Sequence, residues 1–139
     1  MPMTAVPAAT AAMARDECLR LLASEAVGRV VFTTAAMPAA QPVAFVIDRG
    51  DIVFRAHGPL GAARKDVVAF EADNIDPHTF TGWSVLGIGE TYEIRDPARL
   101  AGLVDLPAAL LGTVSQAAAV IAIRLRHLTG RRAQSTDPA

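Results

Sequence analysis

The chain has 139 residues, which is enough for one domain with one hydrophobic core and too few for two. Thirteen Lys and Arg residues against fourteen Asp and Glu residues give a formal net charge of −1, which argues against nucleic acid as a partner. Hydrophobic residues make up 52% of the chain and charged residues only 19%, and this apolar content favours an oligomer. No apolar run reaches the roughly 20 residues of a membrane helix, so we expect a soluble protein without a membrane partner.

Residues 1–14 are rich in Ala, Pro, Thr and Met and lack the basic and apolar blocks of a signal peptide. We therefore expect a disordered leader over 1–14, one folded domain over 15–133 and a frayed tail over 134–139. Cys18 is the only cysteine and stands close to three leucines, which indicates a buried thiol rather than a nucleophile. An unpaired, buried cysteine favours a cytoplasmic protein.

An amphipathic helix is the first predicted element, because apolar residues recur at three- and four-residue spacing from Asp16 to Ala26. Asp16 can cap its start, and Gly28 can adopt the left-handed conformation that ends such a helix. Short runs rich in Val, Ile, Phe and Thr follow. They predict strands over residues 29–34, 42–48, 51–56, 67–73, 83–94 and 118–126.

Turn residues separate the strands, at Met37-Pro38, Arg49-Gly50 and Asp76-Pro77. The sequence Asp48-Arg49-Gly50-Asp51 is the strongest hairpin signal, because Gly50 can supply a positive φ in a tight turn. The strands therefore predict an antiparallel meander with short helices between some of them. These helical segments are expected over residues 58–66, 97–104 with Asp96 as its cap, and 106–111.

Two of the predicted strands are apolar at successive positions, Val43 to Ile47 and Ala119 to Ile123. A strand with one face in water alternates between apolar and polar residues, so both faces of these two should be covered. Few helices are available to cover them. We therefore expect a homodimer whose interface uses residues 42–47 and 118–123.

Few residues form a chemical motif. Gly87-Ile88-Gly89 lies inside a strand pattern and lacks the third glycine of a dinucleotide fingerprint, which favours a bulge or bend. The cluster of Glu71, Asp73, Asp76 and His78 is interpreted as a strand end and a turn rather than a metal site. We predict no metal site and no catalytic side chain.

Arg55 is the one candidate for ligand binding that the residues themselves suggest. It follows Ile-Val-Phe at a strand end, where the chain turns into His57-Gly58-Pro59. An arginine in this place can hold a phosphate, together with the N–H groups of the helical turn that follows. It can equally pair with a carboxylate on a solvated face, and the residues alone leave both readings open.

Several segments together resemble a known family. They are Pro42 to Ile47, Ile52-Val53-Phe54-Arg55, Val68 to Asp73, Gly82-Trp83-Ser84-Val85 and Leu128 to Arg132. This order of segments is similar to that of the pyridoxamine 5′-phosphate oxidase-like flavin-binding split barrels, in their small actinobacterial-type branch. The resemblance implies a mainly β (α+β) fold, namely a six-stranded antiparallel split barrel with short peripheral helices. It also implies a homodimer with two equivalent sites for FMN, or for a deazaflavin, at the subunit interface.

The resemblance also implies which residues form that site. Backbone groups of one strand would contact the flavin ring, a strand end and turn would hold the phosphate, and a third strand would reach the cofactor from the partner subunit. The matching residues are Val43, Ala44 and Phe45 for the ring, Arg55, Ala56, His57 and Gly58 for the phosphate, and Trp83 and Ser84 from the partner. Arg64 or Lys65, in the segment that follows, can fold back beside the phosphate.

One segment departs from the family pattern. Where relatives carry Thr-Lys or Ser-Arg-Lys beside the phosphate, this chain has Pro59 and Leu60, which remove a backbone N–H and a positive charge. The chain also lacks the C-terminal extension that vitamin B6 oxidation requires. Two functions therefore compete. The first is a flavin- or deazaflavin-dependent oxidoreductase acting on a small molecule, and the second is a barrel with no bound cofactor that serves as a ligand-binding or scaffold dimer.

Overall fold

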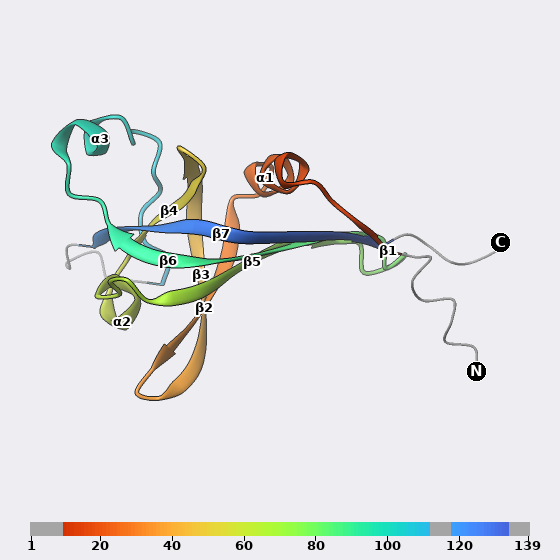
Figure 1. Cartoon of the computed structure of the whole chain (residues 1–139), viewed down its shortest axis with the longest axis horizontal. Coiled ribbons are helices and arrows are strands. Elements are labelled where there is room, and N and C mark those ends of the chain that lie inside the picture. Colours follow the sequence, from red (N-terminus) through yellow and green to blue (C-terminus); the bar gives the residue numbers. More distant parts are fainter. Residues whose placement is uncertain (1–9, 112–117, 134–139) are drawn as a thin grey trace.

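Six strands close into an antiparallel barrel in the computed structural model, which describes residues 10–111 and 118–133 (Figure 1). The strands follow the order β7, β4, β3, β2, β5, β6, and β6 pairs again with β7. The predicted mainly β, six-stranded barrel is therefore confirmed. The elements in chain order are β1 (Thr10–Ala12), α1 (Arg15–Ala23), β2 (Val27–Thr34), β3 (Met37–Asp48), β4 (Asp51–Ala56), α2 (Gly58–Gly61), β5 (Val67–Ile75), β6 (Gly82–Glu93), α3 (Pro97–Ala101) and β7 (Ala119–Ala133).

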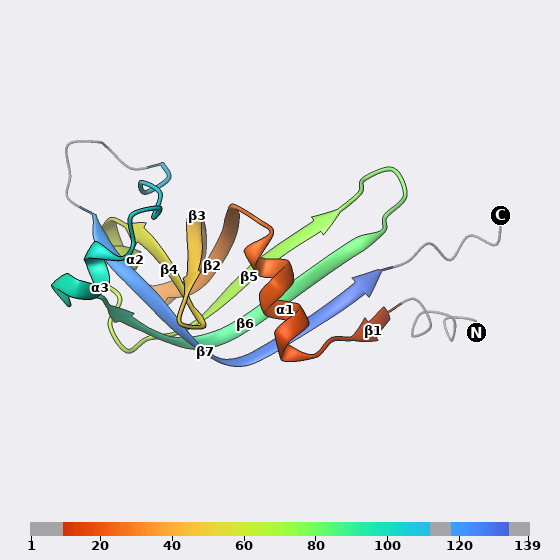
Figure 2. The same cartoon turned by 90° about the horizontal axis from the view of Figure 1, so that it is seen from above.

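Strand β7 joins both edges of the sheet. Its first residues, from Ala119 to Ile123, pair with β4, and its last three pair with β1. On its other side it pairs with β6 from Ile121 to Ala133. Together β6 and β7 form a long ribbon that extends well beyond the barrel and ends beside β1 (Figures 1 and 2).

The core fills the inside of this barrel. Phe54 and Phe70 are completely buried, and the ring of Phe70 meets that of Phe45 edge to face with 4.8 Å between centroids. Helix α1 adds Cys18 and Leu22 to the core, both fully buried, so the predicted buried thiol is confirmed. Helix α2 contributes one residue, Leu60, which is also fully buried.

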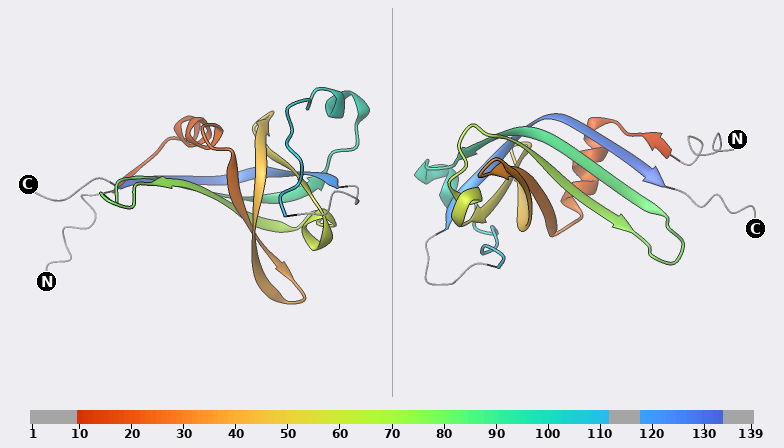
Figure 3. Two further views of the ribbon diagram at one scale, coloured as in Figure 1. Left: turned by 180° about the vertical axis from the view of Figure 1, so that it is seen from behind. Right: turned by 90° about the horizontal axis from the view of Figure 1, so that it is seen from below.

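A second apolar cluster lies on the outer face of the barrel. The stretch from Ile94 to Leu106, here called the α3 segment, packs over β3, β4 and the start of β7, as Figure 3 shows with α3 in teal beside the yellow strands. Its apolar side chains cover Val53, Val120 and Ala122. The chain itself therefore covers the second face of these strands. The α3 segment covers part of the face that the prediction assigned to a second copy, and the homodimer interface over residues 42–47 and 118–123 stays a prediction.

Arg99 anchors the α3 segment. Its guanidinium donates to Asp48 at 2.9 Å and to the Tyr92 hydroxyl at 2.9 Å, and it lies 3.6 Å from Asp51. Tyr92 in turn donates a hydrogen bond to Asp51. Burial, and then the adjacent Asp51 carboxylate, raise the pKa of Tyr92. The anchor ties α3 to the hairpin between β3 and β4.

Helix α1 differs from the prediction at both ends. It begins after Ala14, no side chain caps it, and Asp16 lies in its first turn. It ends at Ser24, in right-handed conformation, so Gly28 is not its terminator. Gly28 lies in β2 instead, where a side chain would overlap the ring of Phe70. The glycine is required for packing rather than for a turn.

Two other local predictions were also wrong. The chain turns at Ala35-Ala36, both with positive φ, so Met37-Pro38 belongs to β3 and pairs with Thr33 and Thr34. The expected helix over 106–111 does not form, because Pro107 disfavours helical conformation at the buried Leu106 before it.

Other local signals were read correctly. Gly50 has a φ of 80° in the hairpin between Asp48 and Asp51. Asp96 accepts a hydrogen bond from the Ala98 N–H at 3.2 Å, as its predicted capping role requires. In the turn between β5 and β6, the Asp76 carboxylate accepts from the His78 N–H at 2.8 Å.

The predicted domain limits need one change. Residues 10–12 of the expected leader form β1, because they pair with Arg131 to Ala133 where β7 runs past the end of β4. Residues 1–9 and the expected tail, 134–139, lie outside the described residues. None of the helices in the described part of the chain is long and apolar enough to cross a membrane.

Candidate functional site

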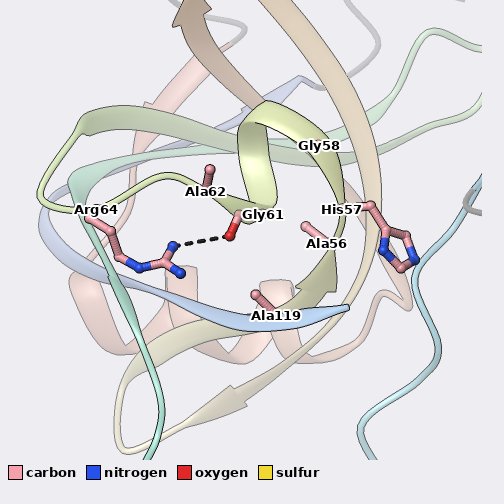
Figure 4. Close-up of a pocket in the computed structure, with 7 residues that line it drawn as sticks. All are labelled: Ala56, His57, Gly58, Gly61, Ala62, Arg64 and Ala119. Carbon is pink, nitrogen blue, oxygen red and sulfur yellow. Dashed lines mark hydrogen bonds between the residues drawn. The ribbon is translucent and has the colours of Figure 1, made fainter. Parts of the chain in front are cut away.

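Two cavities meet at the start of α2. The first has a volume of about 510 Å³ and lies between α2, the end of β4 and the start of β7 (Figure 4). The second has a volume of about 560 Å³ and lies between α2 and the hairpin of β2 and β3. His57 and Gly58 line both cavities. These two predicted site residues therefore stand at the junction of a bipartite pocket.

The first cavity has one charged residue in its lining, Arg64. Its guanidinium donates to the carbonyl oxygens of Gly61 at 3.0 Å and Ala63 at 2.7 Å, and it pairs with Glu93 at 2.5 Å. Figure 4 shows this arginine folded back toward α2. The charge of Arg64 is therefore largely satisfied within the chain. A ligand would have to displace Glu93 to form an ion pair with this guanidinium.

The second cavity is mainly apolar. Besides His57 and Gly58, its lining consists of one polar residue, Gln41, and seven apolar residues, which are Phe32, Ala39, Ala40, Pro42, Pro59, Leu110 and Leu111. The imidazole of His57 is the only titratable side chain in this lining. An apolar hollow with few polar groups suits a flat aromatic ligand.

The strand predicted to bind the flavin ring has buried side chains, so only its backbone groups are available for such a contact. Val43 and Phe45 are 1% and 4% exposed and point into the barrel core, as does Ala56 on β4. Ala44 is also buried but points to the outer face. Extending the register of Phe45 with Phe54 by one residue brings Ala44 alongside Arg55.

Arg55 lies on the outer face of β4 and is half-buried. It pairs in register with Val120 and does not line either cavity, although Ala56 and His57, which follow it, do. Within the described residues it forms no ion pair at all. The alternative that Arg55 simply pairs with a carboxylate therefore has no support among residues 10–111 and 118–133.

Within residues 10–111 and 118–133, α2 itself offers few phosphate donors. Pro59 has no N–H, and Leu60 points into the core. The N–H groups of Gly61 and Ala62 donate to the carbonyl oxygens of His57 and Gly58 at 3.1 and 3.0 Å. The pocket therefore fits a flavin ring better than it fits a phosphate.

Lys65 stands apart from both cavities. It lines a third pocket of about 340 Å³ with Thr91, Tyr92 and Arg124, and with the ion pair of Glu90 and Arg126. Its φ of 58° is unusual for a residue other than glycine. Hydrogen bonds from the Lys65 N–H to the Thr91 carbonyl at 2.7 Å and from the Thr91 N–H to Asp66 at 2.9 Å hold it there.

Trp83 and Ser84 lie at the far end of the molecule from α2. Arg55 pairs with Val120 on β7, whereas Trp83 pairs with Arg132, twelve residues further along the same strand. At about 3.3 Å per residue this separation is roughly 40 Å along the strand. The side chain of Trp83 is buried in the barrel core of the same chain. Ser84 points to the outer face, where its hydroxyl lies 3.4 Å from the Glu71 carboxylate. One chain cannot bring these residues to the cavities beside α2.

The raised pKa of Glu71 was not predicted from the sequence. Burial, and then the neighbouring Asp73, raise its pKa to about 7, against the opposing effect of Arg29 at 3.9 Å. Glu71 and Asp73 thus lie side by side on the outer face, and Glu71 has two long contacts, to Arg29 and to the Ser84 hydroxyl. Among residues 10–111 and 118–133, no three His, Cys, Asp or Glu side chains are close enough to hold a metal ion.

Comparison with known proteins agrees with this architecture. A FAD-binding protein of Mycobacterium smegmatis superposes with a TM-score of 0.75 at 31% identity, covering 89% of this chain and 98% of that one. A FAD- and heme-binding protein of the same organism superposes with a TM-score of 0.71 at 18% identity, over 94% of this chain and 77% of that one, and shows the fold alone.

An uncharacterized protein of Mycobacterium tuberculosis is 43% identical over 95 residues, which are 63% of this chain. The chain spans 62% of the length of this relative. Residues 14–132, almost the whole described domain, match the family described as pyridoxamine 5′-phosphate oxidase. The chain belongs to this family.

Proposed function

We propose that the protein binds a flavin nucleotide in the two cavities beside α2 and acts with it as an oxidoreductase on a small molecule. The observation that carries this proposal is the bipartite pocket at His57 and Gly58 on a barrel whose relative at 31% identity is a FAD-binding protein. The flavin would supply the electron transfer. The chain would orient the ring and exclude water, with no side chain acting as acid or base.

The shape of the pocket favours FAD over FMN and over a deazaflavin. FMN depends on one well-held phosphate, and α2 offers few donors for it. FAD adds an adenosine half, which can fill the apolar cavity of about 560 Å³ while the ring occupies the other. Apolar contact then replaces part of the missing phosphate contact.

We further propose a homodimer, because the family site needs residues from both ends of the molecule. A second copy in reversed orientation would bring its Ser84 toward the α2 end of the first. The face for this contact is an apolar strip across β2, β5 and β6, whose members Val31, Val67, Leu86 and Ile88 are 37% to 71% exposed and surround Ala69. Exposed apolar residues on adjacent strands are typical of subunit interfaces.

A twofold axis that runs across the strands through Ala69 and Ile88 would bring Ser84 of one copy toward the α2 end of the other. On β6 it places residue 84 of one copy opposite residue 92 of the other, next to the Arg64 and Glu93 pair that borders the first cavity. This interface is an alternative to the one predicted from residues 42–47 and 118–123. A cytoplasmic location is consistent with the buried, unpaired Cys18.

One observation favours the alternative function, a barrel that has lost its cofactor. Pro59 and Leu60 withhold two donors, and Glu93 already occupies Arg64. The same fold would then serve as a ligand-binding or scaffold dimer.

Titration of purified protein with FAD, FMN and a deazaflavin, followed by flavin fluorescence, separates these functions. We expect micromolar binding, tightest for FAD, and roughly tenfold weaker binding in His57→Ala, because His57 lines both cavities. Arg20→Ala, on the exposed face of α1, is the matched control. If none of the three binds below about 1 mM, the flavin proposal is wrong and the scaffold function stands.

A further inference from the structure

The apolar strip carries opposite charges at its two ends. At one end, the pocket of Lys65, Arg124 and Arg126 holds three positive charges and one negative charge, that of Glu90. At the other end, Glu71 and Asp73 share the outer face of β5. The surface is therefore polarised along the strand direction.

The basic end, at Lys65, Arg124 and Arg126, has more positive than negative charge. Glu90 is committed to Arg126 at 2.9 Å, and no carboxylate in residues 10–111 and 118–133 pairs with Lys65 or Arg124. Arg124 is held over the ring of Tyr92, with its guanidinium carbon 5.2 Å from the ring centroid. Lys65 and Arg124 thus line a pocket of about 340 Å³ in which the carboxylate of Glu90 is already paired with Arg126.

At the acidic end, the carboxylates of Glu71 and Asp73 repel each other. Two cations lie near this end: Arg29 is 3.9 Å from Glu71 with 59% of its side chain exposed, and Arg131 is in register with Ser84, the β6 partner of Asp73. Because Arg29 is largely exposed, it offsets only part of the repulsion between Glu71 and Asp73. Ser84 provides one long hydrogen bond of 3.4 Å. A cation from outside the chain would relieve this pair.

Position along β5 relates the two ends. Lys65 and Asp73 each lie four residues from Ala69, at the centre of the strip, on opposite sides of it. Asp73, within β5, is therefore roughly 13 Å from that centre, whereas Lys65 lies two residues before β5 and is held beside β6 by the hydrogen bond from its N–H to the Thr91 carbonyl. A second copy turned about a twofold axis across the strands places Asp73 of each copy over Lys65 of the other. The surface is complementary to itself, as a twofold interface requires.

We propose that the Lys65 and Arg124 pocket receives the carboxylates of Glu71 and Asp73 from a second copy of the chain, and that this latch sets the orientation of the dimer. The latch rests on the proposed homodimer and adds the contact that selects its reversed arrangement. Apolar contact alone would tolerate a parallel arrangement, whereas like charges would then face each other at both ends.

Charge exchange tests the latch. The dissociation constant of the dimer is measured by sedimentation equilibrium for wild type, Lys65→Glu, Asp73→Lys and the double variant, at about 50 and 500 mM NaCl. Each single change places like charges face to face at two symmetric contacts and should weaken the dimer at least tenfold at low salt. The double variant restores opposite charges and should recover to within about threefold of wild type. Arg20→Glu, exposed on α1, is the matched control and should leave the constant unchanged.

Each contrary result is distinct. A wild-type dimer that neither single change weakens, or a double variant weaker than both singles, overturns the latch while the homodimer stands. A wild type that is monomeric at micromolar concentration refutes the homodimer and the latch together. If inorganic phosphate stabilises wild type but not Arg124→Ala, and charge exchange has no effect, the pocket is a site for small anions instead. Circular dichroism of every variant confirms that it is folded.

Discussion

Removal of Arg99 should release the α3 segment from the barrel. In Arg99→Ala the carboxylates of Asp48 and Asp51, only 30% and 14% exposed, lose their common cation. Breaking a buried ion pair by removing one partner costs about 3–5 kcal/mol. Partial exposure of Asp48 lets water offset some of this loss, so we expect the free energy of unfolding to fall by about 2–3 kcal/mol. For a domain of this size the melting temperature should fall by roughly 6–10 °C.

The measurement is urea denaturation followed by the fluorescence of Trp83, the only tryptophan, which is buried in the core. Arg95→Ala provides the matched control. Arg95 also pairs with a carboxylate, Glu93 at 2.8 Å, but 78% of its side chain is exposed, so its loss should cost less than about 0.5 kcal/mol. If the two variants lose the same stability, Arg99 does not anchor the segment and the reasoning fails.

Three further changes test other parts of the molecule. Burial, and then the neighbouring Glu17, raise the pKa of the Cys18 thiol above 9.0, so its contribution to stability is intact below pH 9 and lost as the pH rises further. The stability gap between wild type and Cys18→Ala should therefore narrow between pH 8 and pH 10.5 in urea denaturation, and a constant gap would contradict this. Pro59→Lys adds an N–H and a charge at an exposed position and should tighten flavin binding about tenfold in a fluorescence titration; unchanged affinity would mean that α2 does not face the phosphate. Gly28→Ala forces the buried Phe70 ring to move and should cost about 1–3 kcal/mol by thermal denaturation, whereas a melting temperature equal to that of wild type would show that the ring adapts freely.

The buried position of Leu60 changes which substitution can restore the family pattern. A lysine at position 60 would place a charge in the barrel core, where the cost of desolvation exceeds any gain at the phosphate. Only position 59 is open to solvent. Sequence comparison by itself would have paired both positions with phosphate contacts, because it does not show that α2 turns one residue inward.

Local chemistry predicted the elements well where one residue dictates the backbone. Gly50 and Asp96 act as their residue types require, in a turn and at a helix start. Prediction from local chemistry failed where contacts with residues distant in the sequence determine the backbone conformation. Two alanines with positive φ form the turn at Ala35-Ala36 because strand pairing on both sides imposes it, and no property of alanine predicts this.

The site could be predicted only in part for the same reason. His57 and Gly58 were predicted because they adjoin a strand end, and both residues line the two cavities. The separation of Trp83 from them follows from pairing along β7, which the sequence does not specify. The cover provided by the α3 segment was missed because its apolar residues are scattered among turn residues and show no period.

The role of β7 has a consequence for how the protein is made. This strand is the last of the described strands in the chain, yet it alone joins β4 to β6. During synthesis, the strands from β2 to β6 emerge first and keep two unpaired edges until residues 119–133 leave the ribosome. At about 5–20 residues per second this interval lasts seconds, long enough for open edges to associate with one another. Folding of this barrel therefore ends with a single closing event, and production of the protein should depend on chaperones that protect strand edges until that event.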